Sequence, residues 1–215
     1  MEGQPLIGDG RGLYKIHILG NSGTSRREYT RTYSDFPQST LAARLSLILG
    51  IPHISLDRLF WGPDWKAASE EEFRAKIIAA MEQSPNGWII DGDYQRRGGV
   101  IVQEQATDVI WLDPPLILYF PRIMVRTFLR LVGLRPPCSP GCPESFREVF
   151  FDRNSILLWC LTQHRVNRQR GETRMKEIGI GVGTQLDNRK MRRIGGWGSE
   201  LERWIKSVKD MVQEK

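Results

Sequence analysis

A glycine loop directly after an apolar segment is the first feature of the sequence that suggests chemistry. Residues 15–19 alternate as a buried strand does, and Gly20 and Gly23 follow in a G-x-x-G pattern. Such a loop leads a strand into a helix whose first N–H groups can bind phosphate. We therefore interpret the segment as a phosphate-binding loop. Its expected ligand-binding residues are Gly20, Asn21, Ser22, Gly23, Ser39 and Thr40.

The loop is interrupted before the lysine that normally completes it. A polar segment, Thr24–Gln38, separates the glycines from the next predicted helix. The lysine position holds Arg26 when counted from the glycines and Gln38 when counted back from Ser39. Two explanations are open: a real insertion in a protein that has lost or altered catalysis, or translated intron in the gene model. We favour the intron, because insertions are tolerated at loop tips but not inside a ligand cradle.

Three aspartates come just after predicted strands. Because parallel strands end at one edge of a sheet, we expect Asp57, Asp91 and Asp113 to converge near the phosphate loop. Mg²⁺ prefers oxygen ligands, so Ser39, Asp91 and Asp113 are the predicted metal site. Asp57 is predicted to orient the group that accepts the phosphoryl group. The alternative is that each aspartate only caps the helix that follows it.

A helix predicted over residues 116–132 carries a row of arginines. Arg122, Arg126 and Arg130 are four residues apart, and Arg165 is among the basic residues farther along. A column of like charges costs stability unless anions lie against it. We expect these arginines to bind a transferring phosphoryl group, and the alternative is a solvated basic face.

The composition of the 215-residue chain is that of a globular domain. Hydrophobic residues make up 40% and charged residues 26%, and a net charge of +6 suits polyanionic partners. Three cysteines and the lack of an apolar signal core predict a cytoplasmic protein, and no apolar run predicts a membrane span. Nucleic acid is a conceivable partner without a supporting motif, and the sequence does not define the oligomeric state.

Strands and helices alternate along the chain, which predicts an α/β fold with a parallel sheet. Residues 1–14 are expected to form a loose tail, and 15–215 a single domain. The predicted strands are Lys15–Leu19, Ile51–Leu56, Trp88–Ile90, Val109–Leu112 and Lys190–Ile194. The predicted helices span 39–49, 69 to about 83, 116–132, 144 to about 176, and 199–212.

Five motifs follow one another along the chain. They are K-I-H-I-L-G-N-S-G, H-I-S-L-D-R-L-F-W, W-I-I-D-G-D-Y, V-I-W-L-D-P-P and R-R-I-G-G-W-G-S-E-L. Together they resemble the adenylate-kinase-like P-loop kinases, and most closely the topology-modulation-protein group. The resemblance implies a P-loop NTPase three-layer sandwich with a five-stranded parallel sheet of order 2-3-1-4-5 and a helical lid insertion at about 133–185. It also implies ATP-dependent phosphoryl transfer with Mg²⁺.

The resemblance assigns roles to particular residues as well. Arg122 and Arg126 match the spacing of the adenylate kinase lid arginines after the strand-end aspartate, and Arg165 resembles a second lid arginine. Adenylate kinases bind the acceptor phosphate with an arginine where this chain has Gln95, with Arg96 beside it. AMP is therefore doubtful as the acceptor.

The acceptor pocket is expected behind Asp57. Trp61 belongs to a tryptophan-rich segment after this aspartate and is predicted to line the pocket and exclude water, and Arg96 is predicted to bind the substrate. The alternative for Trp61 is simple packing.

The cysteines and histidines give weaker signals. Four residues could bind zinc, as the lids of some adenylate kinases do: Cys138, Cys142, Cys160 and His164. Their spacing differs from that of C-x2-C zinc sites, so zinc is not predicted. His17 is interpreted as a core residue, and His53 has no evident partner.

These observations together predict an ATP-dependent phosphotransferase that resembles nucleoside and nucleotide kinases, with an unidentified small-molecule acceptor. The missing lysine should impair the chain as written. The alternative is a non-catalytic nucleotide- or DNA-binding protein with the same fold. The missing lysine favours that alternative, whereas the aspartates and the arginine row favour the enzyme.

Overall fold

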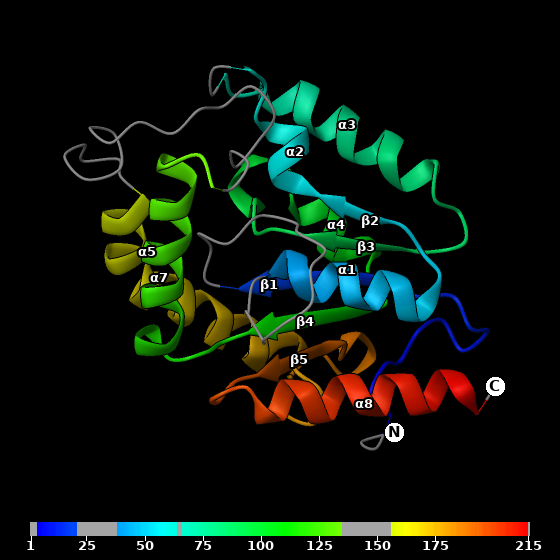
Figure 1. Cartoon of the computed structure of the whole chain (residues 1–215). Helices are drawn as coiled ribbons and strands as arrows, with labels where there is room; N and C mark the ends of the chain where they lie inside the picture. The colour runs from blue at the N-terminus through cyan, green and yellow to red at the C-terminus, as the bar shows by residue number, and fades with distance from the viewer. Residues whose placement is uncertain (1–3, 21–37, 64–65, 135–155, 215) are drawn as a thin grey trace.

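The computed structural model describes residues 4–20, 38–63, 66–134 and 156–214. Its centre is a five-stranded parallel sheet in the order β2-β3-β1-β4-β5 (Figure 1). The strands are β1 (Lys15–Gly20), β2 (His53–Ser55), β3 (Trp88–Asp91), β4 (Asp108–Leu112) and β5 (Met191–Ile194). The predicted α/β fold and the strand order implied by the resemblance are both confirmed.

The helices around the sheet are mostly those predicted. They are α1 (Gln38–Leu49), α2 (Leu56–Phe60), α3 (Glu70–Glu82), α4 (Val100–Gln105), α5 (Leu116–Leu131), α7 (Ile156–Ile178) and α8 (Ser199–Gln213). Short 3₁₀ turns occupy Gln95–Arg97 and Leu186–Asn188. The two short helices α2 and α4 were not predicted; α2 forms because Leu56 and Phe60, four residues apart, are both buried.

Two hydrophobic clusters cover the two faces of the sheet. On one face, α1 and α8 pack against Ile16 and Ile18 of β1. On the other, α2, α3, α4 and α7 contribute to a cluster that includes Leu19 of β1. Successive strand residues point to opposite faces, so the even-numbered residues of β1 meet α1 and the odd-numbered ones meet the α7 side. A strand covered on both faces explains why this segment is an apolar run.

Helices α5 and α7 stand beyond the carboxyl ends of the strands, at the left of Figure 1. A small cluster centred on Tyr119 and Ile123 forms the buried side of α5. The other end of α7 packs on the sheet at Gly171, where an added Cβ would lie 2.4 Å from the ring of Trp111. Only glycine permits this approach, so Gly171 determines how closely α7 packs against the sheet.

Residues 4–14, expected to form a loose tail, are packed against the domain. Leu6 is buried, and the carboxylate of Asp108 accepts the backbone N–H groups of Ile7 (2.7 Å) and Gly8 (3.0 Å). The indole of Trp204 donates to the carbonyl of Pro5 at 3.0 Å. This packing leaves no local signal in the sequence, because the partners lie about a hundred or more residues away.

Candidate functional site

The described residues that flank the predicted phosphate loop are the end of β1 and the start of α1. Gly20 is the last residue of β1, and Ser39 and Thr40 are in the first turn of α1. The strand and helix that must flank such a loop are therefore in place. Residues 21–23, predicted to hold phosphate, and the rest of the interrupting segment lie outside the described residues.

The hydroxyl of Ser39 donates to Oδ2 of Asp91, at the end of β3. The other carboxylate oxygen, Oδ1, lies 2.8 Å from Nε2 of His53. Ser39 and Asp91 are buried, and the His53 side chain is 9% exposed. Two of the three predicted metal ligands, Ser39 and Asp91, thus lie in contact, and His53 joins them. His53 has no evident partner in the sequence because β2 and β3 are adjacent only in the folded sheet.

Asp113 follows β4 but points to the other face of the sheet. Its Oδ2 accepts from Nη2 of Arg193 at 2.5 Å and lies 3.5 Å from Nε of Arg168. Arg193 also stacks over the ring of Trp111, 5.0 Å from its centroid. Side chains two residues apart on a strand point to the same face. Asp113 therefore lies on the α7 face with Trp111, whereas Asp91 lies on the α1 face with Ile89. Asp57, Asp91 and Asp113 were expected to converge, but each has different partners: Asp91 meets Ser39, Asp113 meets two arginines, and Asp57 meets Tyr94.

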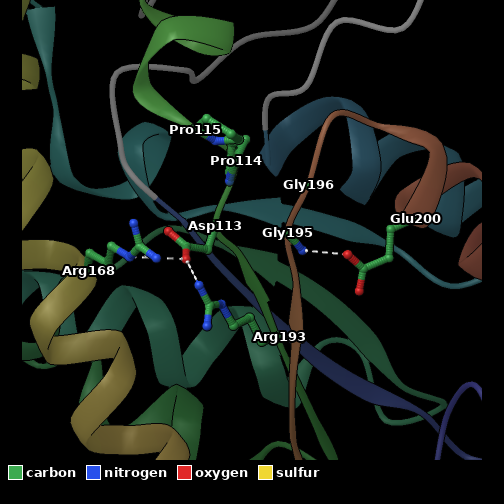
Figure 2. A pocket seen from close by; sticks show the side chains of 8 residues that line it. All are labelled: Asp113, Pro114, Pro115, Arg168, Arg193, Gly195, Gly196 and Glu200. Carbon is green, nitrogen blue, oxygen red and sulfur yellow. Dashed lines mark hydrogen bonds and ion pairs between the residues drawn. The ribbon is translucent and has the colours of Figure 1, made fainter.

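A pocket of about 420 Å³ opens beside Asp113 at the ends of β4 and β5. Figure 2 shows the Asp113 carboxylate between the two guanidinium groups, with Gly195 and Gly196 across from it. Glu200 holds that glycine turn by accepting the N–H of Gly195 at 3.2 Å. The lining residues are Asp113, Pro114, Pro115, Arg168, Arg193, Gly195, Gly196 and Glu200. Charged side chains, two prolines and two glycines thus surround the cavity.

Asp57 lies in the first turn of α2, where the phenol of Tyr94 donates to its Oδ1 at 2.6 Å. Tyr94 packs in turn on Phe60 and Phe73, with ring centroids 5.0 and 5.1 Å away. The ring of Trp61 lies edge-on to Phe60 at 4.8 Å. Asp57 is therefore anchored to an aromatic cluster at the β2–β3 end of the sheet. Packing accounts for the position of Trp61 without a ligand.

The ion pair between Arg174 and Asp93 near β3 was not predicted, whereas His17 is buried in the core, as the sequence indicated. Arg174 of α7 forms a nearly symmetric ion pair with Asp93, at 3.1 and 3.2 Å from its two oxygens, and its side chain is only 9% exposed. Nε2 of His17 lies 2.9 Å from the carbonyl oxygen of Gly92. Burial lowers the pKa of His17 from 6.5 to about 4, so the imidazole is neutral at neutral pH and donates to that carbonyl. The sequence feature that could have indicated Asp93 as a site residue is its position two residues after Asp91, which ends β3.

The predicted lid arginines lie on the two helices beyond the sheet edge. Arg122 and Arg126 are on α5, and Arg165 is an exposed residue of α7. Figure 1 shows α5 on the side of the molecule toward which the strands point, with the start of α7 beside it. The side chains of Arg126 and Arg96 are outside the described part of the structure.

Of the four residues that could bind zinc, the structure describes the side chain of His164 alone. Its Nδ1 lies 2.7 Å from the hydroxyl of Tyr119, a contact that joins α7 to α5. Cys138 and Cys142, and the side chain of Cys160, fall outside the described residues. Within residues 4–20, 38–63, 66–134 and 156–214, no three His, Cys, Asp or Glu side chains gather as a metal-binding group.

Comparisons with known proteins add little to this geometry. No family profile matches the sequence, and no curated protein is significantly similar to it. Among solved structures the chain is similar to an uncharacterized protein from Eubacterium ventriosum ATCC 27560, with 12% identity and a TM-score of 0.42. The alignment covers 94% of this chain and 99% of that one. A similarity of this size supports no argument about family or activity.

The helices of the described segments are short or polar relative to those that cross a lipid bilayer. None of them combines the length and the apolar character that crossing it would require. The structure thus gives no sign of a membrane-spanning helix within those segments.

Proposed function

We propose that the chain is an ATP-dependent phosphotransferase of the adenylate-kinase-like P-loop class, with a small-molecule acceptor. The observation that carries the proposal is the contact between Ser39 and Asp91. Ser39 follows the predicted phosphate loop and opens α1, and Asp91 ends the strand beside β1. In P-loop NTPases, a serine or threonine of the loop and a strand-end aspartate hold Mg²⁺. The contact between the Ser39 hydroxyl and the Asp91 carboxylate supports the same role for these two residues.

The donors of this pair suit Mg²⁺. Both are hard oxygen ligands, and Mg²⁺ is usually bound by one or two carboxylates together with substrate phosphates rather than by an all-protein cage. Ser39 and Asp91 would hold the ion against the phosphates of ATP. Bound there, Mg²⁺ would neutralise negative charge on the phosphates. The Ser39 hydroxyl would keep its hydrogen bond to Asp91, which leaves an oxygen lone pair directed away from the carboxylate.

The pocket between β4 and β5 suits the nucleoside part of ATP. In open α/β sheets, ligands bind at the carboxyl ends of the strands, and this pocket lies at that edge. Arg168 and Arg193 are 47% and 40% exposed, so they can contact a ligand while they remain near Asp113. Arg122, Arg126 and Arg165 are proposed to approach the transferring phosphoryl group from α5 and α7.

The acceptor would bind at the opposite end of the sheet edge. Asp57 and Tyr94 are joined by a 2.6 Å hydrogen bond, and Asp57 is only half-buried. A carboxylate in such a place can accept the proton of an attacking hydroxyl. Arg96 is proposed to complete this site.

The test restores the interrupted loop. In the loop-restored variant, Ser-Gly-Lys replaces Thr24–Gln38, which returns G-N-S-G-S-G-K-S-T to the start of α1. The chain as written should bind ATP weakly, and the loop-restored variant should bind it and release phosphate in the presence of Mg²⁺. Calorimetry and a phosphate-release assay on both proteins give the answer. Equal, strong binding by both proteins would contradict the argument that the loop is split.

A non-catalytic nucleotide- or DNA-binding protein is the second candidate, and the missing lysine favours it. The same pair of proteins separates the two functions. Restored ATP binding without turnover, in the presence of a panel of hydroxyl acceptors, would favour the binding protein. Turnover in the loop-restored variant would favour the enzyme.

A further inference from the structure

His53 is placed to control the carboxylate of Asp91. Its imidazole comes from β2, the edge strand, and its Nε2 is 2.8 Å from Oδ1 of Asp91. The side chains of His53 and Asp91 are 9% and 3% exposed, so water reaches neither freely. Asp91 therefore has one oxygen on His53 and the other on Ser39.

The strand register explains why this contact forms. In the pairing of β2 with β3, His53 lies opposite Ile89 and Ser55 lies opposite Asp91. Alternation puts His53 and Ser55 on the α1 face, while Ile54 joins the cluster on the other face. The imidazole is long enough to reach forward along the strand direction to Asp91. The hydroxyl of Ser55 is buried beside it and has no hydrogen-bond partner among the described residues.

A buried carboxylate needs a donor for each oxygen, and it rotates to find one when a donor is lost. If His53 were absent, Asp91 could turn about its side-chain torsions and present a different oxygen, or none, to Ser39. The orientation of the Ser39 hydroxyl depends on that contact. Groups that hold metal-binding carboxylates in this way typically change metal affinity or activity by about 10–100-fold when they are removed.

We propose that His53 is a positioning residue: it fixes the Asp91 carboxylate so that Ser39 is held with its oxygen lone pairs available to Mg²⁺. The inference rests on the proposed function, since the ion is part of that proposal. The contact itself is a property of the chain as it stands, and it can be tested without nucleotide.

The first experiment uses the complete chain and no ligand. His53→Ala should lower the melting temperature by about 5 °C, because a hydrogen bond to a charged group is lost. In an Asp91→Ala background, the same substitution should lower it by less than half as much. His53→Gln, which keeps an N–H donor, should recover most of the loss. Additive effects, or no recovery by glutamine, would show that His53 does not hold Asp91 and would overturn the inference.

The second experiment measures the Mg²⁺ requirement of phosphate release in the loop-restored variant. His53→Ala should raise the Mg²⁺ concentration for half-maximal rate by about 10-fold or more, with little change in KM for ATP. His53→Gln should restore it. Ser55→Ala is the matched control, because it removes a neighbouring side chain on the same face and should leave the requirement unchanged. A lower melting temperature with an unchanged Mg²⁺ requirement would make His53 merely structural.

The outcomes of the two experiments distinguish failure of the proposed function from failure of the inference about His53. A loop-restored variant that neither binds nor turns over ATP would overturn the proposed function, and with it the role of His53 in metal binding. The melting-temperature cycle would still decide whether His53 holds Asp91.

Discussion

Asp91 and Asp113 end two strands that both pair with β1, yet they have different partners. Asp91 lies on the α1 face and is bonded by the Ser39 hydroxyl and by the His53 imidazole. Asp113 lies on the α7 face and is bonded by two guanidinium groups. The first carboxylate has no lysine or arginine among its described partners, and the second has two arginines.

This difference divides the sheet edge into two kinds of site. A carboxylate held by a hydroxyl and an imidazole still attracts a cation, so the β3 side suits Mg²⁺. A carboxylate between two arginines is already neutralised, and its partners attract anions. The side of β4 and β5 therefore suits the charged and hydrogen-bonding groups of a nucleotide. Two aspartates that look equivalent in the sequence thus have different partners in the fold, and the proposed function assigns them separate roles.

The largest expected effect tests this division directly. In the loop-restored variant, Asp91→Asn should lower kcat at least about 100-fold, because the amide has no negative charge for the ion. Asp113→Asn should lower kcat less than about tenfold and act mainly on KM for ATP. Steady-state kinetics at several Mg²⁺ concentrations measure both. Equal losses of kcat in the two variants would remove the distinction.

The pH dependence of the free energy of unfolding tests whether water reaches His17, which lies on the α7 face of the sheet. His17 is neutral in the folded protein down to a pKa of about 4, whereas the unfolded chain binds a proton near pH 6.5. Stability should therefore be complete above about pH 6.5 and should fall by about 3 kcal/mol as the pH is lowered to about 4. Urea denaturation between pH 4 and 7 measures the fall.

The control for that prediction is His17→Gln, which can still donate to the carbonyl of Gly92 but does not titrate. It should remove most of the fall. Burial also lowers the pKa of His164, which adds a loss in the same direction, so the difference between the two proteins is the relevant quantity. A wild-type curve that is flat from pH 7 to pH 4 would mean that water reaches His17.

A third prediction concerns the contact that brings α7 to Asp113. Gly171→Ala places a methyl group 2.4 Å from the buried Trp111 ring. Alanine is favoured over glycine in a helix by about 1 kcal/mol, but overpacking of a core typically costs about 1–3 kcal/mol. We expect a net loss of up to about 2 kcal/mol. Chemical denaturation measures it, with Gln169→Ala, an exposed position of the same helix, as control.

The same variant sharpens the comparison in the loop-restored protein. Displacement of α7 should raise KM for ATP, because Arg168 lies one turn from Gly171. The Mg²⁺ requirement should not change, because Asp91 is on the opposite face. A changed Mg²⁺ requirement with an unchanged KM would reverse the assignment of the two sides.

The smallest effect is expected from Arg168. Its contact with Asp113 is 3.5 Å long and its side chain is 47% exposed, so Arg168→Ala should cost less than about 1 kcal/mol of stability. Arg193→Ala should cost more, because this arginine has the 2.5 Å contact and also stacks on Trp111. Thermal denaturation of the two variants ranks them. The reverse order would mean that Arg168, not Arg193, anchors Asp113.

Part of the candidate site could be predicted because its signal is local. The apolar run before Gly20, and the short run that ends at Asp91, predict strands that deliver polar groups to one sheet edge. The resemblance to P-loop kinases added the strand order, which the structure confirms. The pairing of Ser39 with Asp91 follows from that order, because β1 and β3 are neighbours.

The sequence by itself determined where the strands end and which residues with reactive groups lie there. Tertiary structure alone decided which of them meet. The face to which Asp113 points depends on its register after Trp111, and its partners come from β5 and from α7, at least fifty residues farther along the chain. His53 reaches Asp91 only because β2 pairs with β3. Composition and periodicity report which local conformation is stable, whereas contacts between distant segments depend on how helices and strands pack, and a single sequence does not encode that in any local pattern.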